Sequence, residues 1–446
     1  MPDLEQDGEN DFLIEKIKVK PVNKRKLIRK TLITAAMAVI FGLIACFTFL
    51  ILEPVINNWL YPEEDPPVIV FPEDLEEMLP EEMLAENLPT ESPEPTSAPE
   101  QEGVVLESEQ IQEILSKVTL DLDNYVELYS VMSAYVSKIK NCMVSITAIK
   151  SAVSWFSDVQ ESRNLCSGVI IFDTGRELLV LTDYSSVMLA EKLLLTFQNN
   201  VIVEATLKRQ DPETDLAVLA VDLEDMPEEL IEEGFSVAPL GSSNVWNLTG
   251  MPVVALGSPM GSSNSVAYGM ITSANTTLSL TDRNYNLLMT DISGSRNASG
   301  VLFNLKGQLI GVITNKRAEA DMENLIGAFG ISELQKIVEK MSNASDVAYM
   351  GIKGGDVPRE VHQEFGVPYG AYVEKIDINS PAMRAGIQQG DVITGINDTT
   401  FTSFRGYSNF LLQAEPEQTV DVSVMRQAQG GEYREMSFSI ELEKMK

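Results

Sequence analysis

The side chains best suited to catalysis and metal binding are scarce in this chain of 446 residues, which contains one histidine and three cysteines. His362 is the only imidazole available to any hydrolytic site. Cys46 lies in an apolar run, whereas Cys142 and Cys166 lie far beyond it, so neither a disulfide scaffold nor a metal cluster is indicated. Whether Cys142 and Cys166 form a disulfide is left undecided, because the sequence does not give the distance between their Cα atoms. No metal and no cofactor is expected.

The formal net charge of −33 excludes another class of function. Proteins that bind nucleic acids neutralise phosphates with clustered lysine and arginine. DNA and RNA are therefore not expected as partners.

A long uncharged run near the N-terminus predicts a membrane anchor. The 22 residues from Thr31 to Leu52 correspond to about 33 Å of helix, enough to cross a hydrocarbon core of roughly 30 Å. The core of a signal peptide is shorter, about 7 to 15 residues. Eight lysines and arginines precede the run, and none occurs in the 50 residues after it. We therefore expect a single transmembrane helix over residues 31–53, a cytoplasmic basic tail over residues 1–30, and the remainder outside the cell membrane.

Two further segments precede the folded part. Residues 61–103 contain nine prolines, fourteen acidic residues and no basic one, so residues 54–103 are predicted to be a disordered, acidic, proline-rich linker. The apolar spacing in residues 104–138 is typical of an amphipathic helix that leads into the first domain.

Beyond Asn141 the sequence consists of short runs rich in β-forming residues, separated by glycine, asparagine and aspartate. Many short strands with turn residues between them predict an all-β barrel or sandwich pair over residues 139–345, closed by a helix from Ser332 to Met341. Residues 346–446 form a separate α+β unit, with strands at YVEKID, DVITGI and TVDVSVMR and a helix near Ser403 to Gln413.

Seven segments in fixed order carry a family resemblance. They are CSGVIIF, LTDYSSV, DPETDLAVLAV, PLGSSN, PVVALGSPMGSSNSVAYGMITS, TDISGSRNASGVLFNLKGQLIGVIT and IGAFGISELQKIVEKM. In this order they resemble the trypsin-like body of HtrA (Deg) serine endopeptidases. YMGI and NSPAMRAGIQQGDVITGIND, which follow, resemble the PDZ domain of that family. The resemblance implies a trypsin-like double barrel followed by a PDZ domain, and a homotrimer as the assembly.

The resemblance assigns three positions to a Ser-His-Asp triad, in which an imidazole takes the proton of the serine and a carboxylate orients the imidazole. Ser185, in LTDYSSV, occupies the position of the histidine, and Asp215 matches the aspartate. Without an imidazole, Asp215 is expected to bond to neighbouring hydroxyls such as that of Ser185. Catalysis would require another base, such as Lys306 or Lys316 in a Ser-Lys dyad.

The nucleophile motif leaves two registers open. Matching from TDISG places the nucleophile on Ser299, which we favour, and matching backwards from VLFN places it on Ala298. In either register the glycine two residues before it is absent, because Asn297 or Arg296 stands there. That glycine lets backbone N–H groups form an oxyanion hole, so the turn that contains Asn297 and Ala298 is expected to be impaired.

The PDZ-like part offers a second candidate site. Its loop residues match those whose backbone N–H groups receive a peptide carboxylate in the resembling domains; they are Tyr349, Met350, Gly351 and Ile352. Tyr407, Phe410 and Leu411 are expected either to form the other wall of the groove or to belong to the domain core.

Together these features predict a membrane-tethered, extracytoplasmic pseudoprotease of HtrA type that binds peptides or unfolded protein C-termini and acts in protein quality control. An active but atypical serine endopeptidase is the first alternative. A non-catalytic assembly scaffold is the second.

Overall fold

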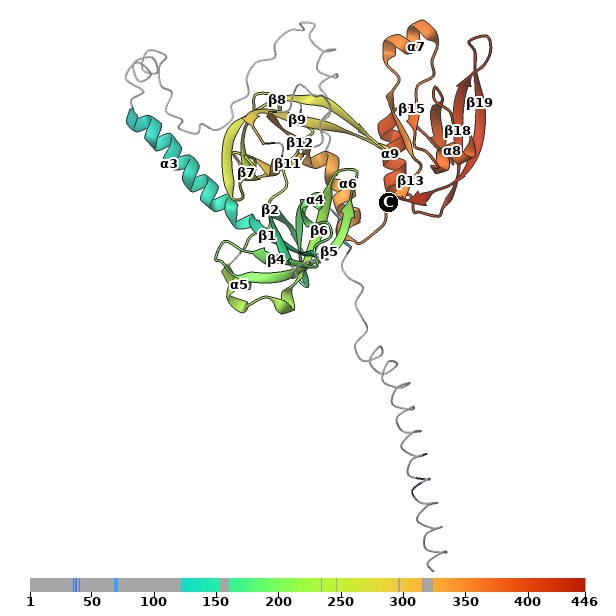
Figure 1. Cartoon of the computed structure of the whole chain (residues 1–446). Helices are drawn as coiled ribbons and strands as arrows, with labels where there is room; N and C mark the ends of the chain where they lie inside the picture. Colours follow the sequence, from blue (N-terminus) through green and yellow to red (C-terminus); the bar gives the residue numbers. More distant parts are fainter. Residues whose placement is uncertain are drawn as a thin grey trace, which may run out of the picture. The chain divides into compact units, whose positions relative to one another are not determined.

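The computed structural model describes residues 35, 37, 40, 68–70, 122–152, 160–233, 235–245, 247–295, 297–314 and 324–445 (Figure 1). Of the predicted membrane helix it therefore describes only three residues, which are helical. No helix within the described ranges is long and apolar enough to cross a membrane. The basic tail and the first part of the predicted lead-in helix lie outside the described residues. The described part of the lead-in is α3 (Leu122–Ile139).

Two closed antiparallel barrels follow α3, which confirms the predicted pair of β-barrels. The first contains six strands in the order β1-β2-β3-β6-β5-β4 and the second six in the order β10-β11-β12-β9-β8-β7. The strands are β1 (Met143–Ala152), β2 (Gln160–Asp173), β3 (Glu177–Asp183), β4 (Lys192–Thr196), β5 (Ile202–Asp211), β6 (Leu216–Asp222), β7 (Pro252–Ser258), β8 (Ser265–Leu280), β9 (Arg283–Ser293), β10 (Ser299–Asn304), β11 (Leu309–Thr314) and β12 (Leu325–Gly330).

Helices are short in this part of the chain. They are η2 (Lys140–Cys142), α4 (Tyr184–Val187), η3 (Leu223–Asp225), α5 (Glu228–Glu233) and α6 (Ile331–Ser342). The buried residues of α6 recur every three or four positions, so this helix presents one apolar face to the core that the barrels share.

Strands β3 and β6 explain why parts of the sequence are continuously apolar instead of alternating. In β3, Leu178 and Val180 belong to the core of the first barrel, whereas Leu179 and Leu181 belong to the core shared with the second barrel. Successive side chains of a strand point to opposite faces. A strand that has a core on each face must therefore be apolar throughout. The motif LTDYSSV begins in the last three residues of β3 and continues into α4.

The C-terminal unit contains a five-stranded path, β14-β15-β16-β18-β19, together with short added strands. Its elements are β13 (Ala348–Tyr349), β14 (Ile352–Asp356), α7 (Arg359–Phe365), β15 (Ala371–Ile376), α8 (Pro381–Ala385), β16 (Val392–Ile396), β17 (Thr399–Thr400), α9 (Phe404–Gln413), β18 (Thr419–Gln427), β19 (Tyr433–Glu441) and β20 (Glu443–Lys444). Ser403 caps α9 by accepting a hydrogen bond from the amide of Gly406.

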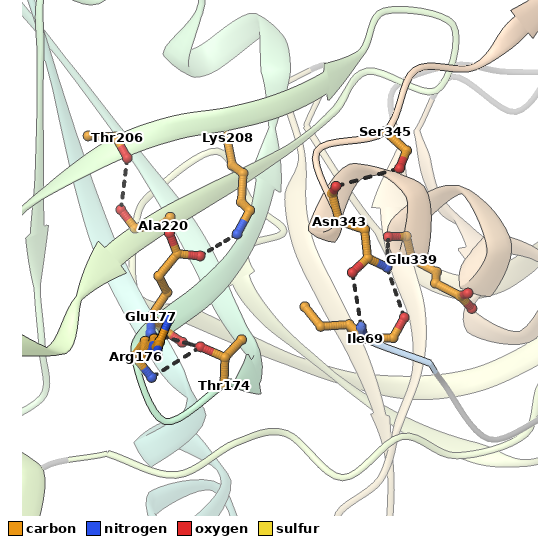
Figure 2. A network of polar contacts seen from close by, with 10 residues as sticks. All are labelled: Ile69, Thr174, Arg176, Glu177, Thr206, Lys208, Ala220, Glu339, Asn343 and Ser345. Atoms are coloured by element: carbon orange, nitrogen blue, oxygen red, sulfur yellow. Dashed lines mark hydrogen bonds and ion pairs between the residues drawn. The ribbon is translucent and has the colours of Figure 1, made fainter. Parts of the chain in front are cut away.

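One residue of the predicted linker, Ile69, is packed and not solvated, which corrects the expectation for this position, whereas Val68 and Val70 are exposed. Ile69 is 2% exposed. Its amide donates to Oδ1 of Asn343 and its carbonyl accepts from Nδ2 of Asn343, both at 2.9 Å (Figure 2). Asn343 immediately follows α6, so this single amide side chain satisfies both backbone groups of a buried residue.

The two cysteines outside the predicted membrane helix are free and buried. The thiol of Cys142 donates to the carbonyl of Ile139, and that of Cys166 contacts the hydroxyl of Thr182. Burial raises the pKa of both thiols to about 12, so both remain protonated and unreactive near neutral pH.

The contact between β7 and β10 generates a test of the barrel packing. Gly300 has φ +119°, and a Cβ there would lie 2.1 Å from the carbonyl oxygen of Leu256. Gly300→Ala is therefore expected to lower the free energy of unfolding by about 3 kcal/mol or more, as measured by urea denaturation. Gly175→Ala is the matched control, because Gly175 also has a positive φ but no atom within 4 Å of its Cβ position, and should cost only about 1 kcal/mol. Equal losses in the two variants would contradict the packing described.

Candidate functional site

Ser185 and Asp215 lie together, joined by two hydrogen bonds. The Ser185 hydroxyl donates to Oδ2 of Asp215 and the Ser185 amide to Oδ1, each at 2.8 Å. Asp215 lies in the turn between β5 and β6 with φ +60°, and its carbonyl accepts from the amide of Tyr184 at 2.9 Å. Ser185 is exposed and Asp215 half-buried, so this pair faces solvent at the end of β3.

This pair lacks a group that could take a proton from a serine. The hydroxyl of Ser185 is not a base near neutral pH, and Asp215 is already bonded to it. His362, in α7, has Nδ1 2.7 Å from the carbonyl oxygen of Val367 and stacks on Tyr369. Its contacts are thus with its own neighbours in the C-terminal unit.

Ser299, the favoured nucleophile, is the first residue of β10 and is 7% exposed. Among the described residues no hydrogen bond joins it to Ser185 or Asp215. Ala298, the nucleophile of the other register, is 4% exposed. Lys306 is exposed in the turn between β10 and β11, where its amide bonds to Asn304, and Lys316 lies outside the described residues.

Two described amides of the turn before Ser299 are engaged within the turn and do not point to a substrate. The amide of Asn297 donates to the hydroxyl of Ser295, and the amide of Ala298 donates to the carbonyl of Ser295, each at 3.1 Å. An oxyanion hole needs donors that point at the place where negative charge develops. These two amides are already engaged within their own turn, while Arg296 lies outside the described residues.

Asp183 is a charged residue beside this site that the sequence motifs did not single out. Its Oδ2 is buried, with no hydrogen-bond partner in the ranges described. Burial raises the pKa of Asp183 to about 7; the hydroxyl of Ser299 opposes this shift, and the negative charge of Asp215 adds to it. A cavity of about 10 Å³, large enough for roughly one water molecule, lies against Asp183 and Gly300. An aspartate at the end of a strand with four buried apolar residues and Thr182 before it was the signal that could have revealed it.

The loop of the second candidate site holds a carboxylate that belongs to the chain itself. The amides of Met350, Gly351 and Ile352 all donate to the side chain of Asp282, in the turn between β8 and β9. Tyr349 contributes differently, since its hydroxyl contacts Asp377. Binding of a peptide carboxylate by this loop stays a prediction, and sequence motifs had not indicated Asp282.

The three aromatic and apolar residues of α9 lie mainly in the core. Tyr407 and Leu411 are 0% and 1% exposed, and Phe410 packs against the same cluster while remaining partly exposed. Tyr407 and Leu411 were expected either to line the groove or to belong to the domain core. Their burial places both in the core. Tyr407 nevertheless reaches the loop through its hydroxyl, which donates to Asp282.

A polar cavity of about 720 Å³ lies beside this contact. Its walls come from β9, α6 and α9, and include Arg283, Asn284 and Ser408. No cluster of three or more histidine, cysteine, aspartate or glutamate residues in the described part of the chain could hold a metal ion.

Comparison with known proteins agrees with this architecture. Residues 166–312 match the trypsin-like peptidase domain family and residues 339–440 match the PDZ domain family. These matches confirm the predicted trypsin-like double barrel with a C-terminal PDZ domain.

Several serine endoproteases are similar to the chain. The probable periplasmic serine endoprotease DegP-like of Halomonas elongata is 29% identical over 289 residues, which are 63% of this chain and 57% of that protein. The serine protease Do-like HtrB of Bacillus subtilis is 31% identical over 249 residues, or 52% of each protein. The serine endoprotease DegS of Haemophilus influenzae is 28% identical over 277 residues, which are 60% of this chain and 76% of that protein. The chain thus spans little more than half the length of the first two.

A solved structure of a variant of the HtrA-type protease AlgW with a tripeptide shares the fold, with a TM-score of 0.50 and 23% identity. The similarity covers 70% of this chain and 96% of that one.

Asp183 generates a prediction about pH. Its folded-state pKa of about 7 exceeds the value of about 3.9 of an unfolded chain. The unfolded state therefore releases the proton first, and the stability that Asp183 contributes below about pH 4 is lost as the pH rises to about 7. Asp183→Asn, which cannot ionise, should match the wild type near pH 4 and exceed its free energy of unfolding by up to about 4 kcal/mol at pH 8.

Urea denaturation at pH 4, 6 and 8 measures this difference. Asp225→Asn, at an exposed position of η3, is the control and should leave the pH dependence unchanged. A difference between Asp183→Asn and the wild type that stays constant across the three pH values would contradict the prediction.

Proposed function

We propose that this protein is a membrane-tethered, extracytoplasmic pseudoprotease of HtrA type that binds peptides or unfolded protein C-termini through its PDZ groove and its degenerate cleft. The observation that carries the proposal is the pair of hydrogen bonds between Asp215 and Ser185, which occupy the carboxylate that an imidazole would need. The engaged amides of Asn297 and Ala298 support it independently. A cleft without base and oxyanion donors can still hold an extended chain, since binding and turnover depend on different groups.

The cellular setting of this proposal rests on the sequence and on the relatives. The uncharged run over residues 31–53 and the basic residues before it support a single-pass anchor with a cytoplasmic N-terminus. The similar protein of Halomonas elongata is named periplasmic, which supports an extracytoplasmic location. Protein quality control in the cell envelope is the proposed process.

An active but atypical serine endopeptidase is the second candidate, and Asp183 is the observation in its favour. A carboxyl group with a pKa of about 7 beside Ser299 could accept a proton near neutral pH. Against it, Ser299 is 7% exposed and the neighbouring amides are engaged, so the serine and its developing oxyanion would both lack support. We therefore favour the pseudoprotease.

An exposed apolar surface on α3 supports assembly into a homo-oligomer, a homotrimer in the proposal. Its large exposed side chains lie along the first half of the helix and are Leu122, Tyr125, Val126, Leu128, Tyr129 and Val131. A monomer would leave this surface in water, which is unfavourable for so many clustered apolar residues. The third candidate function, an assembly scaffold that binds no peptide, would use this same apolar surface of α3.

The degenerate cleft predicts that restoring one residue restores no activity. Full-length wild-type protein and Ser185→His are each incubated with unfolded casein and with a serine-directed fluorophosphonate probe. Loss of a triad member costs on the order of 10⁴ to 10⁶ in turnover and loss of an oxyanion donor about 10² to 10³ more, so neither protein should cleave casein or label Ser299. Labelling of Ser299 in the wild type would instead establish the peptidase. A rise in cleavage of about a thousandfold in Ser185→His would show that the oxyanion turn is intact.

Peptide binding without cleavage is the experiment that tests the proposed function. A fluorescent peptide that ends in an apolar residue with a free carboxylate is titrated with the full-length protein, and anisotropy is measured. Backbone amides that capture a carboxylate should make the free acid bind at least about tenfold more tightly than the same peptide with an amidated terminus. Intact peptide is verified by mass spectrometry. Equal affinities would rule out carboxylate capture, and absence of binding to either peptide would leave the scaffold.

A further inference from the structure

The carboxylate of Asp282 lies in the loop that peptide carboxylates are proposed to use. It is 1% exposed. The amide of Met350 donates to Oδ2 at 2.8 Å, that of Gly351 to Oδ2 at 2.8 Å and Oδ1 at 3.1 Å, and that of Ile352 to Oδ1 at 2.8 Å. Three successive backbone amides thus converge on one carboxylate, which is the arrangement by which a loop binds a chain terminus.

Helix α9 completes the enclosure of the same residue. The hydroxyl of Tyr407 donates to Oδ1 of Asp282 at 2.6 Å, and the hydroxyl of Ser408 donates to the backbone carbonyl of Asp282 at 2.8 Å. Both hydroxyls come from the helix that packs across from β14. Asp282 is therefore held from both the loop and the helix.

One backbone hydrogen bond and one side-chain hydrogen bond also join the residues around Asp282 to β14. The amide of Asp282 donates to the carbonyl of Ile352 at 2.7 Å, and the side-chain amide of Asn284 donates to the carbonyl of Gly354 at 2.8 Å. Peptides that bind at a sheet edge use backbone hydrogen bonds like the one from Asp282 to Ile352 for affinity. The turn thus imitates the terminus of a peptide and one of its backbone hydrogen bonds.

From these contacts we infer that the β8–β9 turn is an internal ligand of the PDZ groove, and that a peptide with a free C-terminal carboxylate must displace Asp282 to bind. The inference rests on the proposed peptide binding and adds its regulation: the groove is closed in the structure described. Peptide binding and release of Asp282 are then one event.

The contact is suited to being opened. Burial raises the pKa of Asp282, while the hydrogen bonds from Tyr407 and from the loop amides oppose that shift. The cost of removing the carboxylate from water thus offsets part of what the hydrogen bonds contribute. A terminal carboxylate offered by a peptide makes the same hydrogen bonds, so an exchange loses none of them.

The turn is also bonded to the first barrel, in addition to the hydrogen bond from the hydroxyl of Thr281 to Asp377 of the C-terminal unit. Arg283 pairs with Asp211 at 2.8 Å with both side chains 3% exposed, and the amide of Thr281 donates to Glu213 at 3.2 Å. Both acidic residues precede β6 in the first barrel. Opening therefore separates the PDZ loop from the turn and leaves the turn attached to the barrels.

Substitution of Asp282 is a cleaner probe than substitution of the loop. A Cβ on Gly351 would lie 2.2 Å from the Cβ of Ser380, and Gly351 has φ +89°. A bulky residue there would distort the loop whether or not it binds a ligand. Asp282→Asn keeps the shape of the side chain but turns one acceptor into a donor that faces the loop amides.

Full-length wild type, Asp282→Asn and Tyr407→Phe are compared by hydrogen exchange of the 350–352 amides without peptide, and by affinity for the free-acid and amidated peptides. Asp398→Asn, an exposed turn aspartate of the same domain, is the matched control, and thermal melts verify folding. In Asp282→Asn we expect exchange at least tenfold faster and affinity for the free acid at least tenfold tighter, with a similar gain for the amidated peptide because an open groove favours every ligand of the groove. Tyr407→Phe should change both measurements a few-fold in the same direction.

The outcomes separate this inference from the proposed function. If the wild type and Asp282→Asn bind the free acid equally, the turn is no competitor and the inference fails while peptide binding stands. If no variant binds either peptide, the proposed binding itself fails and the inference fails with it, whatever the exchange rates.

Discussion

The ion pair between Arg283 and Asp211 is the interaction on which the arrangement of both candidate sites depends. It is almost fully buried and joins the first residue of β9 to the last residue of β5. Although burial acts against it, the charge of Arg283 lowers the pKa of Asp211, so the carboxylate remains ionised. Removing one member of such a pair leaves an uncompensated buried charge, which costs about 3 to 5 kcal/mol.

Two turns derive their positions from this pair. The turn after β5 is fixed further by Thr214, whose hydroxyl donates to Asp211 at 2.6 Å, and this turn carries Asp215. The turn before β9 carries Asp282. One buried contact between the barrels therefore orients the carboxylate bonded to Ser185 and the carboxylate in the PDZ loop, although their chemistry has nothing else in common.

Polar groups at the candidate triad positions are satisfied within the fold. Asp215 bonds to Ser185, whose hydroxyl satisfies one of its carboxylate oxygens. The turn at Asn297 and Ala298 is also satisfied, through Ser295. Since Asp215, Asn297 and Ala298 each have a partner within the fold, none of these groups costs the domain stability as an unsatisfied polar group would.

Much of the fold could be predicted because its signals are local. The apolar run of β3 and the helical spacing of α6 both follow from side-chain periodicity. The family resemblance placed Ser185 and Asp215 in one site, and the structure joins them by two hydrogen bonds. Strand β5 was not predicted because half of its residues are exposed, the apolar Ile202 and Leu207 among them, and its sequence therefore shows no clear alternation. Asp183 and Asp282 were missed for another reason. Their environments arise from residues far apart along the chain, as when Asp282 meets Tyr407, 125 positions away, and no local pattern records such a contact.

The closed groove has a consequence for which ligands could occupy it. A competitor that belongs to the same chain has an effective concentration that dilution of the protein does not change. Free peptides at low abundance would therefore be rejected at every expression level. Ligands that are confined near the protein, or that carry several termini, can reach a local concentration above the effective concentration of Asp282. Through Asp282, the groove would thus discriminate by the local density of chain ends as well as by their sequence.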